Sequence, residues 1–165
     1  MKRAISTVHI GMAFESHVKE VLGRHKFKLE QSGGRDDKGI DLHGKLFGRD
    51  VIVQCKCHQV HVTPNVLREI QGVLSMRSAE TIGILACTEG VREASLRFLK
   101  ASRNPMGIVV IDREQPLIES FIINKVARSL LPKTNIRRIM GKNENGEYTD
   151  GVEIYWDQST KPGID

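Results

Sequence analysis

Three short apolar runs constrain the fold of this chain more than any other feature. They are Val51 to Cys57, Thr81 to Cys87 and Gly107 to Ile111, and strand-forming residues dominate all three. Between them lie segments whose apolar residues recur at helical spacing, one beginning at Thr63–Pro64 and one running from Val91 to Leu99. Strands that alternate with helices predict a strand–helix–strand unit inside a sheet whose faces are covered by helices.

The flanking segments add further elements. We expect a helix over Met12 to Gly23, a strand over Lys26 to Glu30, a polar glycine-rich loop over 32–39, a hairpin that joins Ile40–His43 to Val51–Cys57, a long helix from Leu117 to Leu130, and a strand from Val152 to Trp156. The order α-β-β-β-α-β-α-β-α predicts an α/β fold with a mixed sheet flanked by helices.

Composition limits the class of protein. With 165 residues, of which 39% are hydrophobic, we expect one core domain over 1–131 and a C-terminal extension over 132–165. No apolar run reaches the roughly 18 residues of a membrane span. Three cysteines, two of them one residue apart, do not suggest a disulfide framework. We therefore expect an intracellular, reducing compartment, cytoplasmic or nucleoid-associated, with the mitochondrial matrix as the second choice.

The charge is uneven along the chain. Of the 25 basic and 20 acidic residues, 143–165 hold one base and six acids, so 1–142 hold 24 bases and 14 acids, a net charge of +10. This excess favours a polyanionic partner such as nucleic acid, although it also serves plain solubility.

An acid, an amide and a lysine fall on neighbouring strands. Side chains alternate along a strand, so Gln54 and Lys56 share a face, and a hairpin turning at Phe47–Gly48 would place Asp41 opposite Gln54. The Asp41 carboxylate, the Gln54 amide oxygen and the backbone carbonyl of Cys55 are donors that suit a hard divalent cation. Lys56 could orient a water or stabilise charge on phosphorus. The other interpretation is solvated surface groups or a single ion pair.

The motifs in this order resemble the Mrr-like branch of the PD-(D/E)xK nuclease superfamily, which has the restriction-endonuclease-like fold. The matching segments, within roughly 10–124, are Phe14–Glu15, the loop into Gly39–Ile40–Asp41, Val53–Gln54–Cys55–Lys56, Ile70–Gln71–Gly72, Gly83 to Thr88, Val109 to Asp112, and Leu117. Two departures are Ile40 in place of the proline and Gln54 in place of the usual acid, which removes one negative charge.

The resemblance implies a Mg²⁺-dependent endodeoxyribonuclease, with Mn²⁺ as a substitute ion. Asp41 would be the essential metal ligand, Gln54 would replace the acid, Lys56 would be the catalytic lysine, and Glu15 would reach the metal, often through water. An exposed pair with Lys19 is the other role for Glu15. The substrate would be duplex or branched DNA, and a homodimer is an expectation inherited from the superfamily. The alternative function is a weak or inactive nuclease-fold module that binds nucleic acid or a protein.

Contacts to nucleic acid are expected from basic residues in three places. They are Arg35 and Lys38 in the loop, Lys26, Lys28 and His58 on strands, and Arg137 and Arg138 in a basic segment that could also be a solvated face. The run Cys55–Lys56–Cys57–His58 also allows a zinc interpretation, but it lacks a second ligand pair, and we expect buried thiols.

Overall fold

The computed structural model describes residues 7–32, 39–57 and 61–159, with Thr7 to His9 as backbone only. The helices are α1 (Thr7–Gly23), α2 (Pro64–Leu74), α3 (Glu93–Ala101) and α4 (Lys125–Leu130). The strands are β1 (Phe27–Gln31), β2 (Leu42–Leu46), β3 (Arg49–Lys56), β4 (Ile82–Cys87), β5 (Met106–Ile111), β6 (Ile118–Ile123), β7 (Lys133–Lys142) and β8 (Tyr148–Asp157). None of the helices in these ranges has the length and apolar character needed to cross a membrane.

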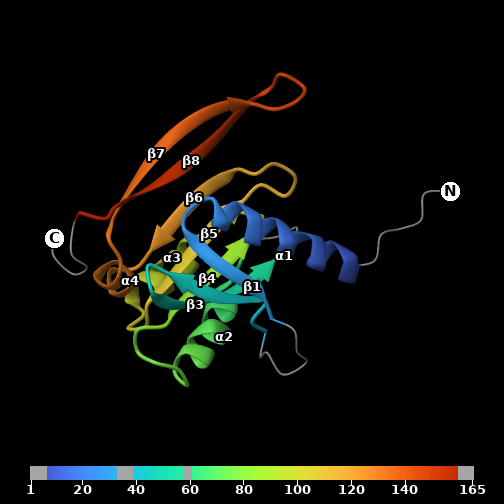
Figure 1. Cartoon of the computed structure of the whole chain (residues 1–165). Helices are drawn as coiled ribbons and strands as arrows, with labels where there is room; N and C mark the ends of the chain where they lie inside the picture. Colours follow the sequence, from blue (N-terminus) through green and yellow to red (C-terminus); the bar gives the residue numbers. More distant parts are fainter. Residues whose placement is uncertain (1–6, 33–38, 58–60, 160–165) are drawn as a thin grey trace.

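The strands form one mixed sheet in the order β1-β2-β3-β4-β5-β6-β8-β7 (Figure 1). β3, β4 and β5 are parallel and are connected through α2 and α3, whereas the other neighbours are antiparallel. The mixed sheet flanked by helices is therefore confirmed.

Two apolar clusters lie on opposite faces of this sheet. On one face α1 packs its stripe, which includes Phe14 and Val18, against Val53 and its neighbours. On the other face α2 and α3 cover a cluster that includes Ile52 and Leu67. Because Ile52 and Val53 are consecutive in β3 and lie in different clusters, the alternation along this strand fixes which face each later side chain takes.

The β2–β3 hairpin follows the predicted turn and register. Phe47 and Gly48 both have positive φ (48° and 78°), as a tight two-residue hairpin turn requires. Leu42 pairs with Val53 and Leu46 with Arg49, so both pairs are centred on the Phe47–Gly48 turn, as the predicted register requires.

The predicted helix from Leu117 to Leu130 is wrong. Its first half is strand β6, which pairs with β5 and buries Ile118, Phe121 and Ile123 on the α1 face; only the second half is helical, as α4. Asn124 separates the two elements, because its side-chain oxygen accepts a hydrogen bond from the Ala127 N–H at the start of α4 (3.0 Å).

The predicted strand near Val152 exists and is longer than expected, and its partner β7 was not predicted. The two form a ribbon that projects from the body of the sheet, and β8 meets β6 at the pair Ile118–Val152 (Figure 1). At the base of the ribbon the Trp156 ring packs edge-on against Phe47 and Phe121, and its Nε1–H donates to the carbonyl of His25 (3.0 Å). The segment after 132 thus extends the same sheet, and the domain division at 131 stays a prediction.

Candidate functional site at the end of strand β3

Asp41 lies where β2 leaves β3. The ladder between these strands stops at Leu42–Val53, and the N–H of Asp41, just outside it, donates to the Val53 carbonyl (2.9 Å). The Asp41 carbonyl accepts from the Ser32 N–H (2.9 Å), and its carboxylate Oδ2 accepts from the backbone N–H of Cys55 (2.7 Å). The carboxylate therefore takes the place of the backbone partner that β2 no longer offers to β3. We call the point where β2 leaves β3, formed by Asp41, Val53 and Cys55, the β2–β3 fork.

The fork also presents a backbone oxygen. The N–H and C=O of one strand residue face the same neighbouring strand, so the Cys55 carbonyl points to the same side as the N–H that binds Asp41. In the described part of the chain no three His, Cys, Asp or Glu side chains form a group that could hold a metal by themselves. A carboxylate beside a carbonyl nevertheless fits a hard divalent cation that takes amide and water oxygens as its other ligands.

Asp41, Gln54 and Lys56 do not share one face of the sheet as the alternation predicted. Ile40 packs in the α2-side cluster and Leu42 in the α1-side cluster, so the expected alternation through Asp41 fails. The reason is that β2 begins only at Leu42. By alternation from Ile52, Gln54 and Lys56 lie on the α2 face, whereas Asp41 reaches the edge of β3 in the plane of the sheet.

Gln54 has a partner that was not predicted. Its side chain is 4% exposed, and its Nε2 donates to Oε2 of Glu69 on α2 (3.1 Å). Gly39, at φ +81°, lies against the same amide, since a Cβ built at Gly39 would stand 3.2 Å from Nε2. The only signal for Glu69 in the sequence is its place beside the apolar stripe of α2, which does not specify a contact with β3.

The pKa of the Cys55 thiol indicates which charged groups lie near it. Burial, which is the largest cause, raises the pKa of this thiol well above its usual range, and the negative charges of Asp41 and Glu15 raise it further. Glu15, half-buried on α1, is therefore close enough to act on the same group as Asp41. Cys55 and Cys57 are free thiols that are only partly buried and pack against the α1-side cluster, whereas Cys87 is fully buried.

Several predicted nucleic-acid contacts lie away from the fork. Lys26 and Lys28 line a groove of about 650 Å³ near the hairpin turn. Lys28 pairs with Lys45, which is four residues from Asp41, or roughly 13 Å along the strand. Arg35, Lys38 and His58 lie outside the described residues.

The two arginines predicted in the C-terminal segment lie in strand β7 of the β7–β8 ribbon. Arg137 and Arg138 are consecutive in β7, so their side chains project from opposite faces. Arg137 lies opposite Glu153 and Arg138 opposite Val152. β8 thus places an acid beside one of the two positive charges.

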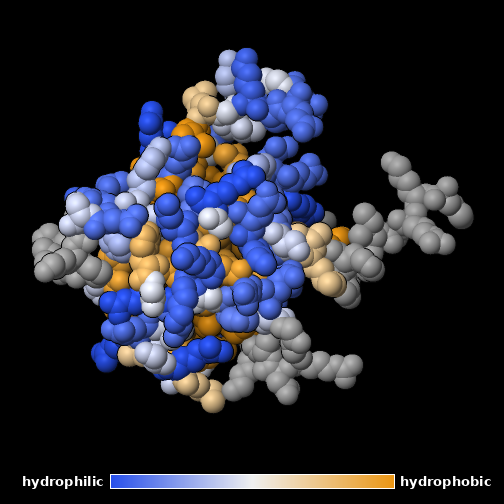
Figure 2. Space-filling model, viewed as in Figure 1, coloured by the Kyte–Doolittle hydropathy of each residue, from blue (hydrophilic) through white to orange (hydrophobic). Residues whose placement is uncertain are grey.

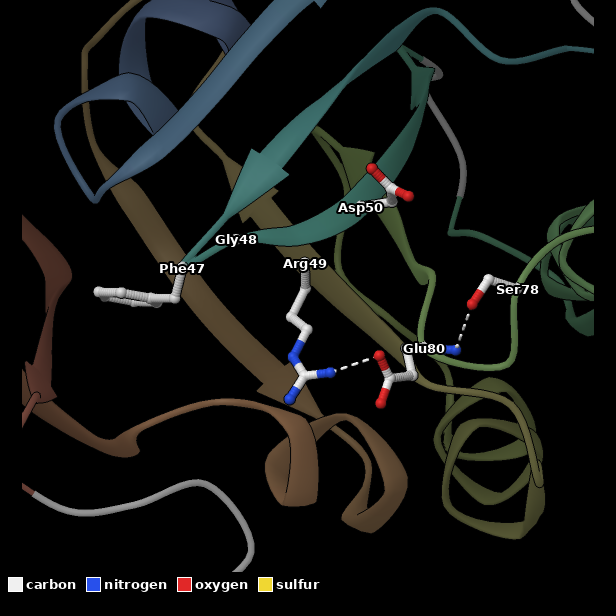
Figure 3. Close-up of a pocket in the computed structure, with 6 residues that line it drawn as sticks. All are labelled: Phe47, Gly48, Arg49, Asp50, Ser78 and Glu80. Atoms are coloured by element: carbon white, nitrogen blue, oxygen red, sulfur yellow. Dashed lines mark hydrogen bonds and ion pairs between the residues drawn. The ribbon is translucent and has the colours of Figure 1, made fainter.

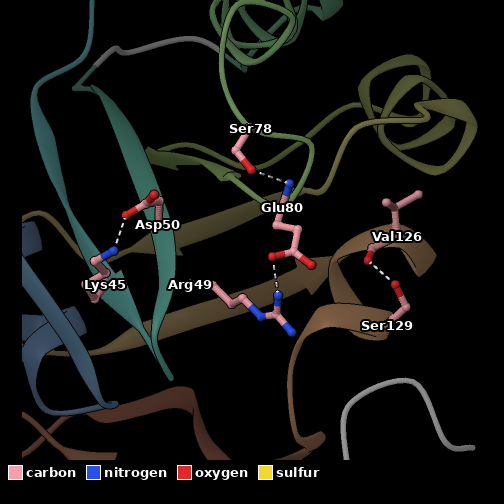
Figure 4. A network of polar contacts seen from close by, with 7 residues as sticks. All are labelled: Lys45, Arg49, Asp50, Ser78, Glu80, Val126 and Ser129. Atoms are coloured by element: carbon pink, nitrogen blue, oxygen red, sulfur yellow. Dashed lines mark hydrogen bonds and ion pairs between the residues drawn. The ribbon is translucent and has the colours of Figure 1, made fainter.

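A hollow of about 330 Å³ lies at the start of β3, at the other end of the strand from Lys56. Arg49 and Glu80 face each other across it and form an ion pair (2.5 Å), beside a second pair, Lys45–Asp50 (Figures 3 and 4). Hydrophilic residues cover most of the visible face of the molecule (Figure 2). This hollow holds its charges in pairs and contains none of the predicted site residues.

Comparison with known proteins gives both sequence and structural matches. The family model Mrr_cat, described as restriction endonuclease, matches residues 10–119. The uncharacterised mitochondrial protein C824.03c of Schizosaccharomyces pombe is 33% identical over 143 residues, which cover 81% of this chain and 58% of that protein. The chain thus spans little more than half the length of this relative.

Two solved structures have similar parts at 18% identity. An XisH family protein from Nostoc punctiforme has a TM-score of 0.46 over 67% of this chain and 98% of its own. The MspJI restriction endonuclease in complex with a 27-mer oligonucleotide has a TM-score of 0.43 over 58% of this chain and 25% of its own.

Proposed function

Because the chain belongs to the restriction endonuclease family, we propose that it is a metal-dependent endodeoxyribonuclease that hydrolyses phosphodiester bonds of DNA. The observation that carries this proposal is the Asp41 carboxylate held at the β2–β3 fork by the N–H of Cys55, one residue before the end of β3 at Lys56. Phosphodiester hydrolysis requires a cation site and a positive group near the phosphate, and a fixed carboxylate and a lysine at the same end of β3 could supply them.

The donors for Mg²⁺ or Mn²⁺ would be the Asp41 carboxylate, the Cys55 carbonyl and the Gln54 amide oxygen, with Glu15 through water. When bound, the ion polarises the phosphoryl oxygen and acidifies a water. The Cys55 N–H orients the Asp41 carboxylate at the end of β3, where the cation would bind. The negative charges of Asp41 and Glu15, which together raise the pKa of the Cys55 thiol, attract a cation to this place.

Lys56 acts at the end of β3. Its side chain is half-buried, and it extends from the same face as Gln54. An ammonium group there binds the phosphate oxygen, orients the attacking water and stabilises the negative charge that develops on the phosphoryl group. We propose duplex or branched DNA as the substrate, bound through its backbone by basic residues, because an aromatic content of 5% does not favour recognition by base stacking.

Plasmid cleavage tests the function. With Mg²⁺ we expect nicking of supercoiled plasmid, and we expect Asp41→Asn and Lys56→Met each to lower the rate at least about 100-fold. Lys100→Met, which removes an exposed lysine from the last turn of α3, should cut like the wild type. Wild-type rates in either site variant would refute the assignment. A four-way junction beside linear duplex of the same sequences measures structure selectivity.

A module that binds DNA without cutting it is the second candidate. The observation in its favour is Gln54, a buried neutral residue at the position where the usual motif of the superfamily has an acid. This candidate predicts DNA binding in a gel-shift assay together with no cleavage in Mg²⁺ or Mn²⁺. The homodimer and the compartment stay predictions.

A further inference from the structure

The partner of Gln54 is an exposed acid on a separate element. Gln54 is buried in β3, whereas Glu69 is exposed on α2, and the two are joined by the hydrogen bond from Nε2 to Oε2 (3.1 Å). Gly39 closes the same end of the amide, because a Cβ at this position would lie 3.2 Å from Nε2. The nitrogen end of the Gln54 amide is therefore enclosed by two neighbours.

An ionised carboxylate can only accept hydrogen bonds, whereas an amide donates at one end and accepts at the other. Beside Glu69 the Gln54 amide has one favourable orientation, with nitrogen toward the acid and Oε1 directed away from it. Without that acceptor the two ends are alike in shape, and either could face α2.

We propose that Glu69 is a positioning residue, which orients the Gln54 amide so that its oxygen is available to the cation at the β2–β3 fork. The significance of this orientation for metal binding rests on the proposed function, but the pairing itself can be tested without any metal. A residue that orients a ligand in this way typically changes metal affinity 10- to 100-fold when it is lost.

The pair also constrains which residue can stand at position 54. A carboxylate there would face the Glu69 carboxylate at about 3 Å, and two acids this close cannot both be ionised at neutral pH. Gln54→Glu should therefore weaken the folded protein although it adds a potential metal ligand. Exchanging both residues restores a pair of one amide and one carboxylate, now with the amide on α2.

The experiment compares the wild type with Glu69→Gln, Gln54→Glu and the double exchange, with Glu93→Gln on α3 as a matched control for loss of an exposed acid. In EDTA, thermal unfolding should show Gln54→Glu below the wild type and the double exchange above Gln54→Glu. The side-chain amide NMR signals of Gln54 should shift in Glu69→Gln and stay unchanged in Glu93→Gln. Titration calorimetry should show Mg²⁺ binding at least about tenfold weaker in Glu69→Gln.

The outcomes separate this inference from the proposed function. Additive effects of the two changes in EDTA, with unshifted Gln54 signals, would overturn the pairing even if the wild type binds Mg²⁺ and cuts DNA. If the stability effects of the two changes are coupled in EDTA but the wild type and Glu69→Gln bind Mg²⁺ equally well, the pair contributes only to folding stability. This result would overturn the positioning role. A wild type that neither binds Mg²⁺ nor cuts DNA would refute the proposed function and the positioning role together, while leaving the measured pairing.

Discussion

Replacing Asp41 by alanine or by asparagine separates its structural contribution from its charge. Both variants lose the negative charge and therefore relieve any repulsion with Glu15 equally. Only the asparagine keeps a side-chain oxygen that can accept from the Cys55 N–H, the group that Asp41 binds at 2.7 Å. The difference in stability between Asp41→Ala and Asp41→Asn thus isolates this hydrogen bond.

The structure sets the magnitude of that difference. In Asp41→Ala the Cys55 N–H loses its acceptor at a place where β2 has already left the ladder, and a partly buried donor without a partner costs about 1–2 kcal/mol. For a protein of 165 residues each kcal/mol corresponds to roughly 2–4 °C in melting temperature. Asp41→Ala should therefore melt about 2–8 °C below Asp41→Asn.

Thermal unfolding followed by circular dichroism in EDTA is the assay. Addition of Mg²⁺ at ten times its Kd should then stabilise the wild type by about 1.4 kcal/mol and neither variant. Equal melting temperatures for Asp41→Ala and Asp41→Asn in EDTA would show that the carboxylate does not serve β3 as an acceptor. An equal stabilisation of all three proteins by Mg²⁺ would show that Asp41 is not a ligand of the cation.

The remaining predictions concern stability away from the fork. Gly44→Ala should cost at least about 3 kcal/mol in urea unfolding, because the new Cβ would lie 1.9 Å from the backbone oxygen of Lys28, and β1 would have to separate from β2. Gly72→Ala in α2, with open space around its Cβ, should instead stabilise by about 0.5–1 kcal/mol, and a loss there would contradict the packing described. Burial lowers the pKa of His25, so the unfolded chain binds more protons than the folded protein, and stability should fall as the pH is lowered through about 6.5. His25→Gln should reduce the change in melting temperature with pH in this range. An unchanged slope would show that other groups cause the pH dependence.

The hairpin could be predicted from sequence because its determinants are local. The turn residues Phe47 and Gly48 fix the register, and the register brings Asp41 to the end of β3. The β6 error has the opposite cause, since the spacing of Leu117, Ile118 and Phe121 is compatible with a helix as well as with a strand. Antiparallel pairing with the preceding strand β5 decides between the two, and the spacing of these three residues does not specify that pairing.

The sequence selects candidate residues for the site, but it does not specify how their side chains are arranged. Asp41, Gln54 and Lys56 stand out as polar residues next to apolar strands, and no tertiary information is needed to select them. The contact of Glu69 depends on how α2 is rotated over the sheet, which is set by the packing of Leu67 and other residues of its buried stripe. An exposed acid beside such a stripe looks like any solvated helix residue until the helix is placed.

The distribution of acids around β3 explains why a neutral residue at position 54 is consistent with a cation site. Glu15 belongs to the helix on one face of the sheet, Glu69 to the helix on the other, and Asp41 lies at the strand edge between them. A fourth carboxylate at Gln54 would stand beside Glu69 and would take up a proton instead of adding charge. The amide avoids this repulsion and still offers an oxygen, so the charge that attracts a cation stays concentrated on Asp41 and Glu15.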